Sequence, residues 1–504
     1  MARNDPKKDV VIVGLGWTGA IMGMELADEG LEILALERGN DRRTVPDFEY
    51  PQIADELRYA IRYELMQRPS RSTVTIRRTL NEIALPYRQL GSFLLGDGVG
   101  GAGVHWNGHN WRPMVEELRL RSYVEERFGA DIIPEDMTIQ DWGVTYEELE
   151  PHFDRFEQVA GITGQAGNIN GQIIEGGNPF EAPRSRDYPM PPLPHTLDAE
   201  MFAVAARAKG YHPFPRPGGN ASQAYVNPYG MQLGPCNFCG FCERYGCLNY
   251  SKSSPQTCIL DALRRKPNFS YKANAEVLRV ELAPDGKTAT GVTYWDEKAG
   301  EEVFQPADLV ILAAYQMHNV HLMLLSGIGQ PYDPRTGEGV VGKNYAYQMN
   351  GGTTLFFKDR NFNPFVAAGS NGMIIDDFAI NQIDFAAEGF IGGSYINSGV
   401  TNGQPIRSMP LPKGTPTWGA GWKQGVGEWY GHTMNIGSHG SNMSYRDCYF
   451  DLDPTYTDQH GRPMLRMTFN WKDNDIRMTQ FMRTKIEDIA QSMNPDSWQS
   501  SYKS

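Results

Sequence analysis

Apolar and polar positions alternate most regularly near the N-terminus. An apolar run, Val10–Val13, is followed by a glycine turn, a helical pattern over about Ala20–Glu29 and a second apolar run, Ile33–Leu36. Short apolar runs bounded by turn residues are typical of buried strands, and apolar positions that recur every three or four residues are typical of a helix. The pattern therefore predicts a strand–helix–strand unit in a parallel sheet, which is an α/β arrangement.

Two later regions depart from this order. Proline and glycine become frequent at about 164–235 and 359–425, and these residues break long helices and favour loops and inserted segments. Residues 271–325 return to strand and helix patterns. Because a chain of 504 residues is long enough for two or three domain cores, we expect two interleaved domains rather than two in tandem.

The glycine turn between the first strand and the helix reads GLGWTG. Its glycines are Gly14, Gly16 and Gly19, and an acidic residue, Glu37, ends the second strand. In a dinucleotide site the first glycine permits a tight turn, the second lets the backbone approach a pyrophosphate, the third brings helix and strand together, and the acid binds a ribose. The helix N-terminus adds partial positive charge for the phosphates. This unit predicts a bound dinucleotide and leaves FAD and NAD both open.

A second glycine cluster, GDGVGGAGVHWNGHNWRP, covers Gly96–Pro113. So many missing side chains in one segment indicate a backbone that is pressed against a ligand.

Charge and hydropathy narrow the class of protein. The formal net charge is −13, with charges of both signs scattered along the chain, so nucleic acid is not an expected partner. Mean hydropathy is −0.47 and no apolar run is long enough to span a bilayer, so we expect any membrane contact to go through a partner. We identify no secretory signal in the first residues, which leaves the location open.

Four of the six cysteines lie in one short segment: Cys236, Cys239, Cys242 and Cys247. Their spacing, CxxCxxCxxxxC, is near that of ferredoxins, in which closely spaced thiolates hold an iron–sulfur cluster. A zinc site is one alternative, although paired zinc-binding cysteines usually lie farther apart. Disulfides are another, although such close spacing gives strained small loops. Cys258 and Cys448 stand alone, and we expect ordinary buried thiols there.

Taken together, these features resemble the glucose–methanol–choline (GMC) family of flavin oxidoreductases. The blocks that carry the resemblance follow the family's order over about residues 10–350: GLGWTG with Glu37, GVGGAGVHWNG, NAEVLRVELAPDGKTATGVTYWD, LVILAAYQMHNVHLMLLSGIG and GVVGKNYAYQ. Three further phrases, TIQDWGVTYEELEPHFD, GPCNFCGFC and LRMTFNWKDNDIRMTQFM, are most similar to the large subunits of bacterial gluconate 2-dehydrogenase and of sorbitol and fructose dehydrogenases.

The resemblance implies an α/β (α+β) fold, in which a Rossmann-like FAD-binding domain is interleaved with an antiparallel-sheet substrate domain. It places the FAD-binding domain at 1–45, 86–165 and 236–345, with the cysteine loop at 234–252. The other ranges are a connecting or lid segment at 46–85 and the substrate domain at 166–235 and 346–504. The block that carries the family's catalytic histidine is expected beyond residue 504.

The family also implies which residues contact FAD: Gly14, Gly16, Gly19, Glu37, Gly100, Gly101, His105, Asn107, Val277 and Ala313. His105 is placed where sugar-oxidising relatives have a histidine bonded covalently to the flavin 8α carbon, and a histidine that only packs near the flavin is the alternative. A backbone group at about Val277 would meet the adenine. In the multi-subunit relatives a [3Fe–4S] cluster is held by three cysteines at the position of this cysteine loop.

The implied reaction is oxidation of a secondary alcohol of a sugar acid or polyol, with D-gluconate to 2-keto-D-gluconate as the best candidate. Hydride passes to FAD, and electrons leave through the iron–sulfur cluster to a cytochrome c subunit or a quinone. A small subunit would bring the complex to the periplasmic side of a bacterial inner membrane, with the cytoplasm as the alternative. A soluble oxidase that makes H₂O₂ and a non-catalytic homologue that retains FAD and partner binding are the competing interpretations.

A carboxylate substrate calls for a basic side chain near the reacting carbon. Arg216, Arg407 and Lys423 are candidates, although such residues are more often surface charges. His432 and His439 fall in the region that resembles the substrate-domain sheet, where we expect a substrate wall or a structural role rather than catalysis.

Overall fold

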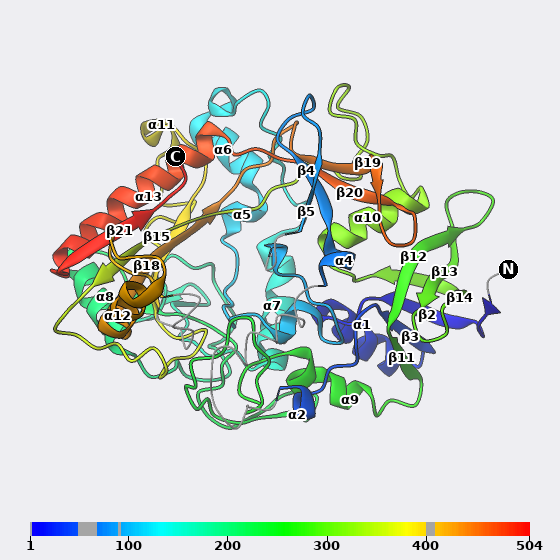
Figure 1. The fold of residues 1–504 in the computed structure, drawn as a ribbon, viewed down its shortest axis with the longest axis horizontal. Helices are drawn as coiled ribbons and strands as arrows, with labels where there is room; N and C mark the ends of the chain where they lie inside the picture. Colours follow the sequence, from blue (N-terminus) through cyan, green and yellow to red (C-terminus); the bar gives the residue numbers. More distant parts are fainter. Residues whose placement is uncertain (1–2, 49–67, 89–91, 400–408) are drawn as a thin grey trace.

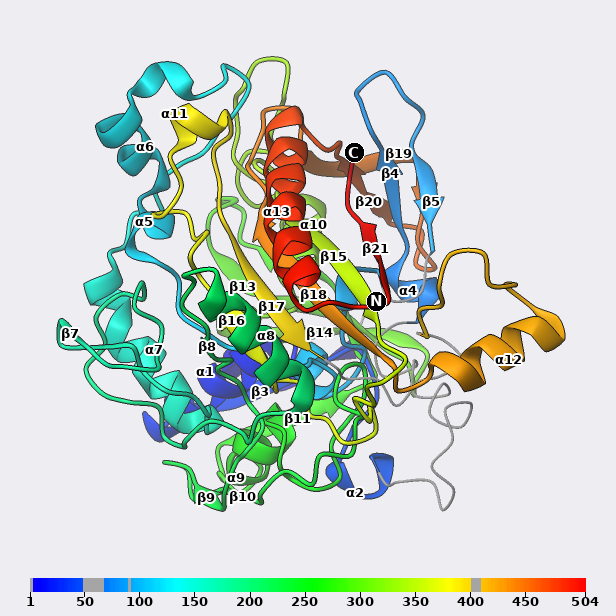
Figure 2. The ribbon, with the colours of Figure 1, turned by 90° about the vertical axis from the view of Figure 1, so that its left-hand side faces the viewer.

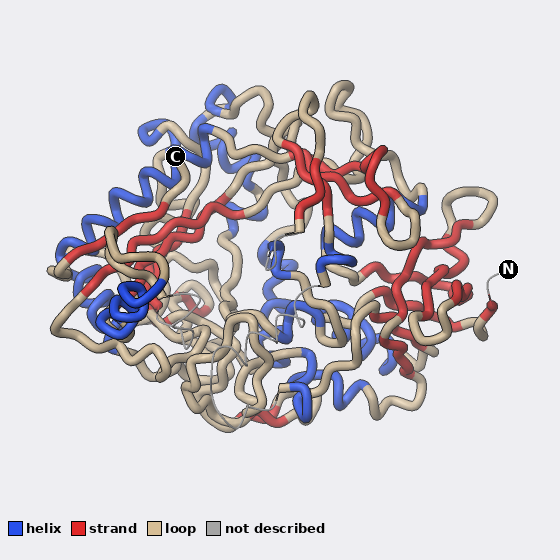
Figure 3. The backbone as a smooth tube through the Cα atoms, in the orientation of Figure 1, coloured by secondary structure: helices blue, strands red, loops and turns tan. Residues whose placement is uncertain are grey.

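The computed structural model describes residues 3–48, 68–88, 92–399 and 409–504. Within this part of the chain the strands gather into three larger sheets and two short two-stranded ones (Figure 3). The first sheet has the order β11-β3-β2-β14-β13-β12, with β1 beside β14. Its strands are β1 (Arg3–Asn4), β2 (Lys8–Val13), β3 (Ile33–Glu37), β11 (Phe269–Ala273), β12 (Ala275–Leu282), β13 (Ala289–Asp296) and β14 (Glu301–Leu312).

This first sheet is parallel on one side and antiparallel on the other. β11, β3, β2 and the second half of β14 run parallel, whereas β12, β13 and the first half of β14 form an antiparallel meander. β2 and β3 are runs of buried aliphatic residues, as expected for parallel strands that are covered on both faces. Helix α1 (Trp17–Asp28) follows β2 and leads into β3. The predicted strand–helix–strand unit and fold class are therefore confirmed.

The second sheet is antiparallel throughout, in the order β21-β15-β18-β17-β16-β8. Its strands are β8 (Phe214–Pro215), β15 (Gln348–Phe356), β16 (Met373–Ile375), β17 (Ser394–Gly399), β18 (Thr433–Ser441) and β21 (Ser497–Ser501). Helices α8 (Leu197–Ala208) and α13 (Asp473–Ser492) contact each other and pack on this sheet (Figure 2). A large cluster of buried apolar side chains, among them Phe202, Ile436 and Ile486, lies between these helices and the sheet.

A third sheet joins segments that are far apart in the sequence. Its order is β19-β20-β4-β5, with bounds Tyr449–Thr457, Pro463–Thr468, Val74–Arg77 and Leu85–Tyr87. It lies above the first sheet in Figure 1, and β19 contacts helix α10 (Gln316–Ser326). The predicted lid segment, 46–85, thus contains β4, which forms a hairpin with β5. β4 also pairs with β20, which belongs to the predicted substrate range 346–504. The domain boundaries themselves stay a prediction.

The remaining elements are short except for α7 and α12. The helices are α2 (Thr44–Asp47), α4 (Pro69–Ser72), α5 (Val115–Leu118), α6 (Leu120–Phe128), α7 (Tyr146–Ala160), α9 (Asp261–Leu263), α11 (Phe385–Glu388) and α12 (Gly419–Trp429). The short strands are β6 (Asn168–Ile169), β7 (Gln172–Ile173), β9 (Tyr225–Val226) and β10 (Gln232–Leu233). Single helical turns are η2 (Ser92–Leu94), η3 (Gly101–Val104), η4 (Ala130–Ile132) and η5 (Gln256–Leu260). In the described residues, no helix combines the length and apolar character needed to cross a membrane.

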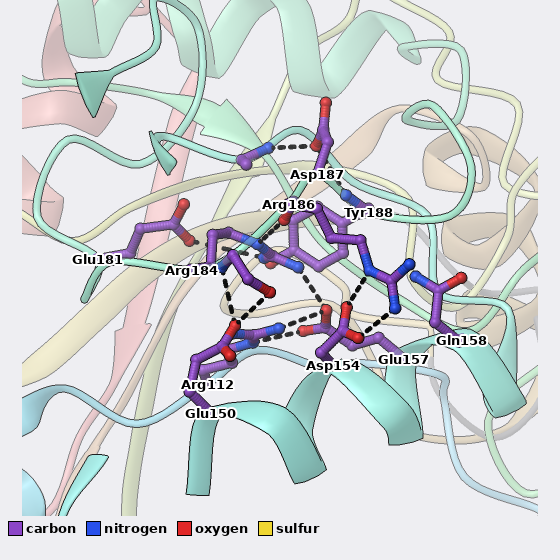
Figure 4. Close-up of polar contacts among 12 residues, drawn as sticks. Arg112, Glu150, Asp154, Glu157, Gln158, Glu181, Arg184, Arg186, Asp187 and Tyr188 are labelled. Atoms are coloured by element: carbon purple, nitrogen blue, oxygen red, sulfur yellow. Dashed lines mark hydrogen bonds and ion pairs between the residues drawn. The ribbon is translucent and has the colours of Figure 1, made fainter. Parts of the chain in front are cut away.

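Helix α7 is joined to the loop after it by buried charges (Figure 4). Its first turn has a capping box, in which Thr145 and Glu148 exchange side-chain-to-backbone hydrogen bonds. Near its end the Glu157 carboxylate accepts two hydrogen bonds from Arg112, at 2.9 and 3.0 Å, and a third from Arg184. Arg184 is fully buried, so its charge depends on this carboxylate.

Candidate functional site

A cavity of about 310 Å³ lies between the first and third sheets. The glycine turn and the ends of β3, β12 and β14 line one side, and α10 with the β19–β20 turn lines the other. Six of the predicted FAD contacts line it: Gly14, Gly16, Glu37, Gly101, Val277 and Ala313. The other four are not among its lining residues: Gly19, Gly100, His105 and Asn107.

The three glycines of the turn have different steric surroundings. Gly14 has a φ of 96°, and a Cβ there would lie 2.6 Å from the carbonyl oxygen of Ala313 on the neighbouring strand end. A Cβ on Gly19 would collide with the carbonyl oxygen of Gly14. At Gly16, by contrast, the nearest protein atom would be 3.8 Å away. Gly14 and Gly19 therefore let the chain pack on itself, while the bare backbone of Gly16 leaves room on the cavity side.

Helix α1 begins at this turn and presents its N-terminus to the cavity. Gly16 is the N-cap, and the first turn of the helix carries no acidic side chain. The cavity lining includes Leu15, Trp17 and Thr18. Since the first N–H groups of a helix lack partners within the helix and carry partial positive charge, this end suits a phosphate group.

Glu37 holds the turn and the following loop together. Its buried carboxylate accepts hydrogen bonds from the backbone N–H of Leu15, at 3.0 Å, and of Gly39, at 2.9 Å. Burial raises the pKa of this carboxyl, and the two hydrogen bonds oppose that effect. Each oxygen keeps a second lone pair, so the contact of Glu37 with a ribose stays a prediction.

Two buried ring nitrogens in the cavity wall fit a large polar ligand. Trp17 Nε1 and His318 Nε2 have no hydrogen-bond partner in the part of the chain that the structure describes, and both residues line the cavity. Burial lowers the pKa of His318 well below 6.5, so its ring is neutral at physiological pH. Buried polar atoms normally have partners. These two atoms, the glycine backbone and the helix N-terminus together fit a dinucleotide.

Some cavity residues were not identified from the sequence. Arg462, in the β19–β20 turn, donates to the carbonyl oxygen of Leu278 at 3.0 Å and to the Glu276 carboxylate at 2.7 Å, beside the predicted adenine position. His318 lies on α10. For His318 the signal was available, because it lies within the LVILAAYQMHNVHLMLLSGIG block. For Arg462 the sequence held no such signal, because Arg462 is far from β12 in the sequence and contacts it only in the folded chain.

The second glycine cluster packs on the first. Gly100 donates its N–H to Leu15 O at 2.7 Å, and a Cβ on Gly100 would overlap the side chain of Gln256. Gly101 faces Gly16, where a Cβ would lie 3.1 Å from the Gly16 Cα. Gly101 thus forms part of the cavity wall, and Gly100 supports it from behind.

His105 and Asn107 lie beyond the cavity wall. His105 is buried, its Nε2 donates to Leu95 O at 3.0 Å, and burial lowers its pKa to about 4. The side chain of Asn107 holds His109, accepting from the His109 N–H at 3.1 Å and donating to its Nδ1 at 3.2 Å. The covalent bond from His105 to flavin therefore stays a prediction.

The cysteine loop contains free thiols. All six cysteines of the chain are unpaired in the described structure, which argues against disulfides in this loop. Cys258 and Cys448 are buried, as expected. Burial raises the pKa of Cys236 to about 12 and that of Cys242 to about 11, and the neighbouring thiols add to both effects. Among the residues described, no three His, Cys, Asp or Glu side chains converge as a ready site for one metal ion.

A buried lysine lies against this loop. Lys252 has no exposed surface, and its Nζ donates to the carbonyl oxygens of Trp106 (2.8 Å), Cys242 (2.7 Å) and Tyr245 (2.6 Å). It thereby joins the second glycine cluster to the cysteine loop. Within the described ranges no carboxylate forms an ion pair with it, and the thiols of Cys242, Cys247 and Cys239 are the first acidic groups that favour its charge. A buried cation without a carboxylate fits an anionic group held by these cysteines.

The proposed substrate-side residues are separated by the fold. Arg407 lies outside the described residues, Lys423 is exposed on α12, and Arg216 is buried just after β8. His432 Nδ1 lies 3.1 Å from a backbone oxygen, and His439 lies on β18. Of the two candidate cations that the structure describes, Arg216 lies inside the protein and Lys423 does not.

Comparisons with known proteins agree with this geometry. Residues 216–350 match the family described as GMC oxidoreductase. The chain is 53% identical over 501 residues to the gluconate 2-dehydrogenase flavoprotein of Pantoea cypripedii, covering 98% of this chain and 81% of that protein. It is 25% identical to the fructose dehydrogenase large subunit of Gluconobacter japonicus, over 45% of this chain and 39% of that protein. The crystal structure of pyridoxine 4-oxidase from Mesorbium loti covers 98% of this chain with a TM-score of 0.53, at 13% identity and 82% coverage of that chain.

The structural likeness supports the fold, and the sequence identity to the Pantoea protein supports the family. The family prediction made from the motifs is thus confirmed, and the dinucleotide expected in the cavity is FAD. The chain therefore belongs to the GMC oxidoreductase family and is an FAD-dependent dehydrogenase that acts on CH–OH donors.

Proposed function

We propose that the chain is the flavoprotein subunit of a dehydrogenase that oxidises a secondary alcohol of a sugar acid, with D-gluconate giving 2-keto-D-gluconate. The observation that carries this proposal is the 53% identity to a gluconate 2-dehydrogenase flavoprotein over 98% of the chain. The cysteine loop also supports the proposal, because a flavoenzyme that delivers electrons directly to O₂ has no need of a group of thiols beside the second glycine cluster.

FAD, when bound, accepts the hydride that leaves the carbinol carbon. The Gly14–Gly19 turn and the N-terminus of α1 would hold its pyrophosphate, and the backbone at Val277 would contact its adenine; all of these except Gly19 line the cavity. His318 Nε2 and Trp17 Nε1 gain hydrogen-bond partners from it. The second glycine cluster would contact its flavin end, and His105 is the residue that would bond to it. No described side chain is assigned as the base that takes the hydroxyl proton.

Electrons leave through an iron–sulfur cluster, of the [3Fe–4S] type, held by three of the four loop cysteines. Lys252 supports this proposal, because its buried ammonium balances the negative charge of thiolate ligands. The same lysine bonds to the second glycine cluster, so flavin and cluster would share one rigid support. The acceptor is a cytochrome c subunit or a quinone, and a small subunit completes the complex on the periplasmic side of an inner membrane.

The test uses the protein expressed from its complete gene together with its neighbouring subunits. Reduction of an artificial electron acceptor is measured with D-gluconate, sorbitol and D-fructose, and O₂ uptake is measured in parallel. We expect D-gluconate to give the highest kcat/KM, with dye reduction far faster than O₂ uptake. Equal rates with O₂ would identify an oxidase, and a preference for a polyol would overturn the assignment to a sugar acid. A flavin that no substrate reduces would identify a non-catalytic homologue.

A further inference from the structure

Arg216 is a buried cation whose hydrogen bonds are incomplete. It lies just after β8, is 5% exposed and is flanked by β17 of the antiparallel sheet. Its Nη2 donates to Asn397 Oδ1 at 2.9 Å and to the carbonyl oxygen of Ser398. Its Nε is buried and has no partner among the described residues. An unsatisfied buried N–H on a charged group is costly, so this side chain calls for a further acceptor.

The contact of Arg216 with His109 does not supply that acceptor. Because Asn107 Oδ1 accepts from the His109 backbone, its amide NH₂ must face His109 Nδ1, which then acts as an acceptor. The proton of the neutral ring therefore lies on Nε2, which donates to Gly369 O at 3.0 Å. Arg216 Nη1 lies 2.8 Å from this same nitrogen. The His109 contact thus lies at Nη1 and leaves Nε, on the opposite edge of the guanidinium, without an acceptor among the described residues.

The charge of Arg216 is also incompletely balanced. No carboxylate in the described part of the chain forms an ion pair with it, and the acidic groups that favour its charge are Tyr395 and Asp198. Asp198 is itself 1% exposed, and burial raises its pKa, which disfavours its negative charge. Burial also lowers the pKa of Arg216 to about 10, which still leaves the guanidinium charged at neutral pH.

The surroundings of Arg216 suit a polyhydroxylated molecule. The backbones of Gly372 and Gly399 lie against the guanidinium, where an added Cβ would be 3.1 and 3.6 Å from it. Tyr395, the register partner of His439, donates its hydroxyl to His439 Nδ1 at 2.6 Å, which leaves the Nε2–H of the neutral histidine as a donor. The Tyr395 ring meets the Trp111 indole edge to face at 4.6 Å. Trp111 lies near the end of the second glycine cluster, so this contact joins that cluster to β17 of the antiparallel sheet.

We propose that Arg216, with Asn397 beside it, binds the carboxylate of an open-chain sugar acid and so makes the site selective for acids over neutral polyols. The inference rests on the proposed function, because it names the part of the substrate that this site recognises. A carboxylate supplies the negative charge and the acceptor that Nε lacks, and arginine–carboxylate pairing is strong when both are shielded from water. Arg216 is thus a specificity residue and takes no part in the hydride or proton transfer.

The test compares Arg216→Gln and Arg216→Lys with the wild type and with Arg207→Gln, which removes an exposed arginine on α8. Two quantities are measured: kcat/KM for D-gluconate and sorbitol with a dye acceptor, and the Kd of 2-keto-D-gluconate from the change it causes in flavin absorption. For Arg216→Gln we expect kcat/KM for the acid to fall about 10- to 100-fold and the Kd of the keto acid to rise by a similar factor. We expect kcat/KM for sorbitol to change by less than about threefold, which is the size of effect that substitutions without a specific role commonly have.

Each outcome decides between the proposals. Equal losses for acid and polyol, or no loss for either, would overturn the role of Arg216 while leaving the dehydrogenase in place. If the wild type neither oxidises nor binds a sugar acid, the proposed function itself fails. Arg216→Lys keeps the charge but not the planar fork, so we expect an intermediate loss. Loss of FAD from both Arg216 variants would show that the residue is structural, which also refutes the inference.

Discussion

Replacing Asp376 with asparagine should stabilise the protein at high pH and not at low pH. Asp376 follows β16, is almost completely buried and accepts a hydrogen bond from Asn178 Nδ2 at 2.6 Å. Burial raises the pKa of its carboxyl from 3.8 to about 7, and the nearby carboxyls of Glu117 and Glu181 add to this effect. Since one pKa unit corresponds to about 1.4 kcal/mol, holding this group ionised in the folded protein costs about 4 kcal/mol.

The sign of the pH dependence follows from the raised pKa. Below about pH 4 the carboxyl is protonated in both folded and unfolded chains, and the folded state loses nothing. As pH rises from about 4 to 7 the unfolded chain ionises first, so folding stability is progressively lost. Asp376→Asn has no such ionisation, and its amide oxygen can still accept from Asn178. The free energy of unfolding of Asp376→Asn, relative to wild type, should therefore increase between pH 4 and 8 by up to about 4 kcal/mol.

Chemical denaturation of both proteins at pH 5 and pH 8, with FAD content held equal, measures this difference. Asp359→Asn, which removes an exposed carboxylate, is the control for surface charge. The reasoning would be refuted if the free energies of unfolding of Asp376→Asn and wild type differed by the same amount at both pH values. That result would show that folding does not raise the pKa of the Asp376 carboxyl.

Three further perturbations test the glycine turn, the lysine and the charge network. Gly19→Ala, whose Cβ would collide with the Gly14 carbonyl, should lower the FAD content of purified protein, whereas Gly427→Ala, in open space, should not. Lys252→Met should make the reduction potential of the proposed iron–sulfur cluster more negative, measured by a redox titration followed by EPR, because the reduced cluster would lose a buried positive neighbour. Glu157→Gln should lower the free energy of unfolding by about 3–5 kcal/mol, since the buried Arg184 would be left with only the more distant Glu181 carboxylate, at 4.0 Å, among the described residues, and denaturation against the exposed Glu25→Gln measures it.

The dinucleotide unit could be predicted from the sequence because its signals are local. The turn, α1 and the acid at the end of β3 all lie within the first 40 residues, and each glycine has its own steric requirement. The dinucleotide motif therefore lies in one short stretch of sequence. The cysteine loop could be predicted for the same reason, because its four cysteines lie close together in the sequence.

Other parts of the site depend on contacts that no spacing shows. Arg462 reaches the predicted adenine position only because β20 pairs with β4 and thereby carries the β19–β20 turn over β12. The burial of Arg216 follows from the pairing of β8 with β16, and from the sequence alone Arg216 and the exposed Lys423 were equal candidates. The motifs predicted the cavity that fits a dinucleotide, while the choice between these two cations required the sheet.

We infer that electrons leave this flavoprotein through a cluster held by the cysteine loop. Iron and acid-labile sulfide, measured against FAD in the purified complex, test it most directly. We expect both to accompany FAD in the wild type, and both to be lost in Cys242→Ser while FAD remains bound. A complex that contains FAD and reduces a dye with D-gluconate, yet contains neither iron nor labile sulfide, would contradict the claim.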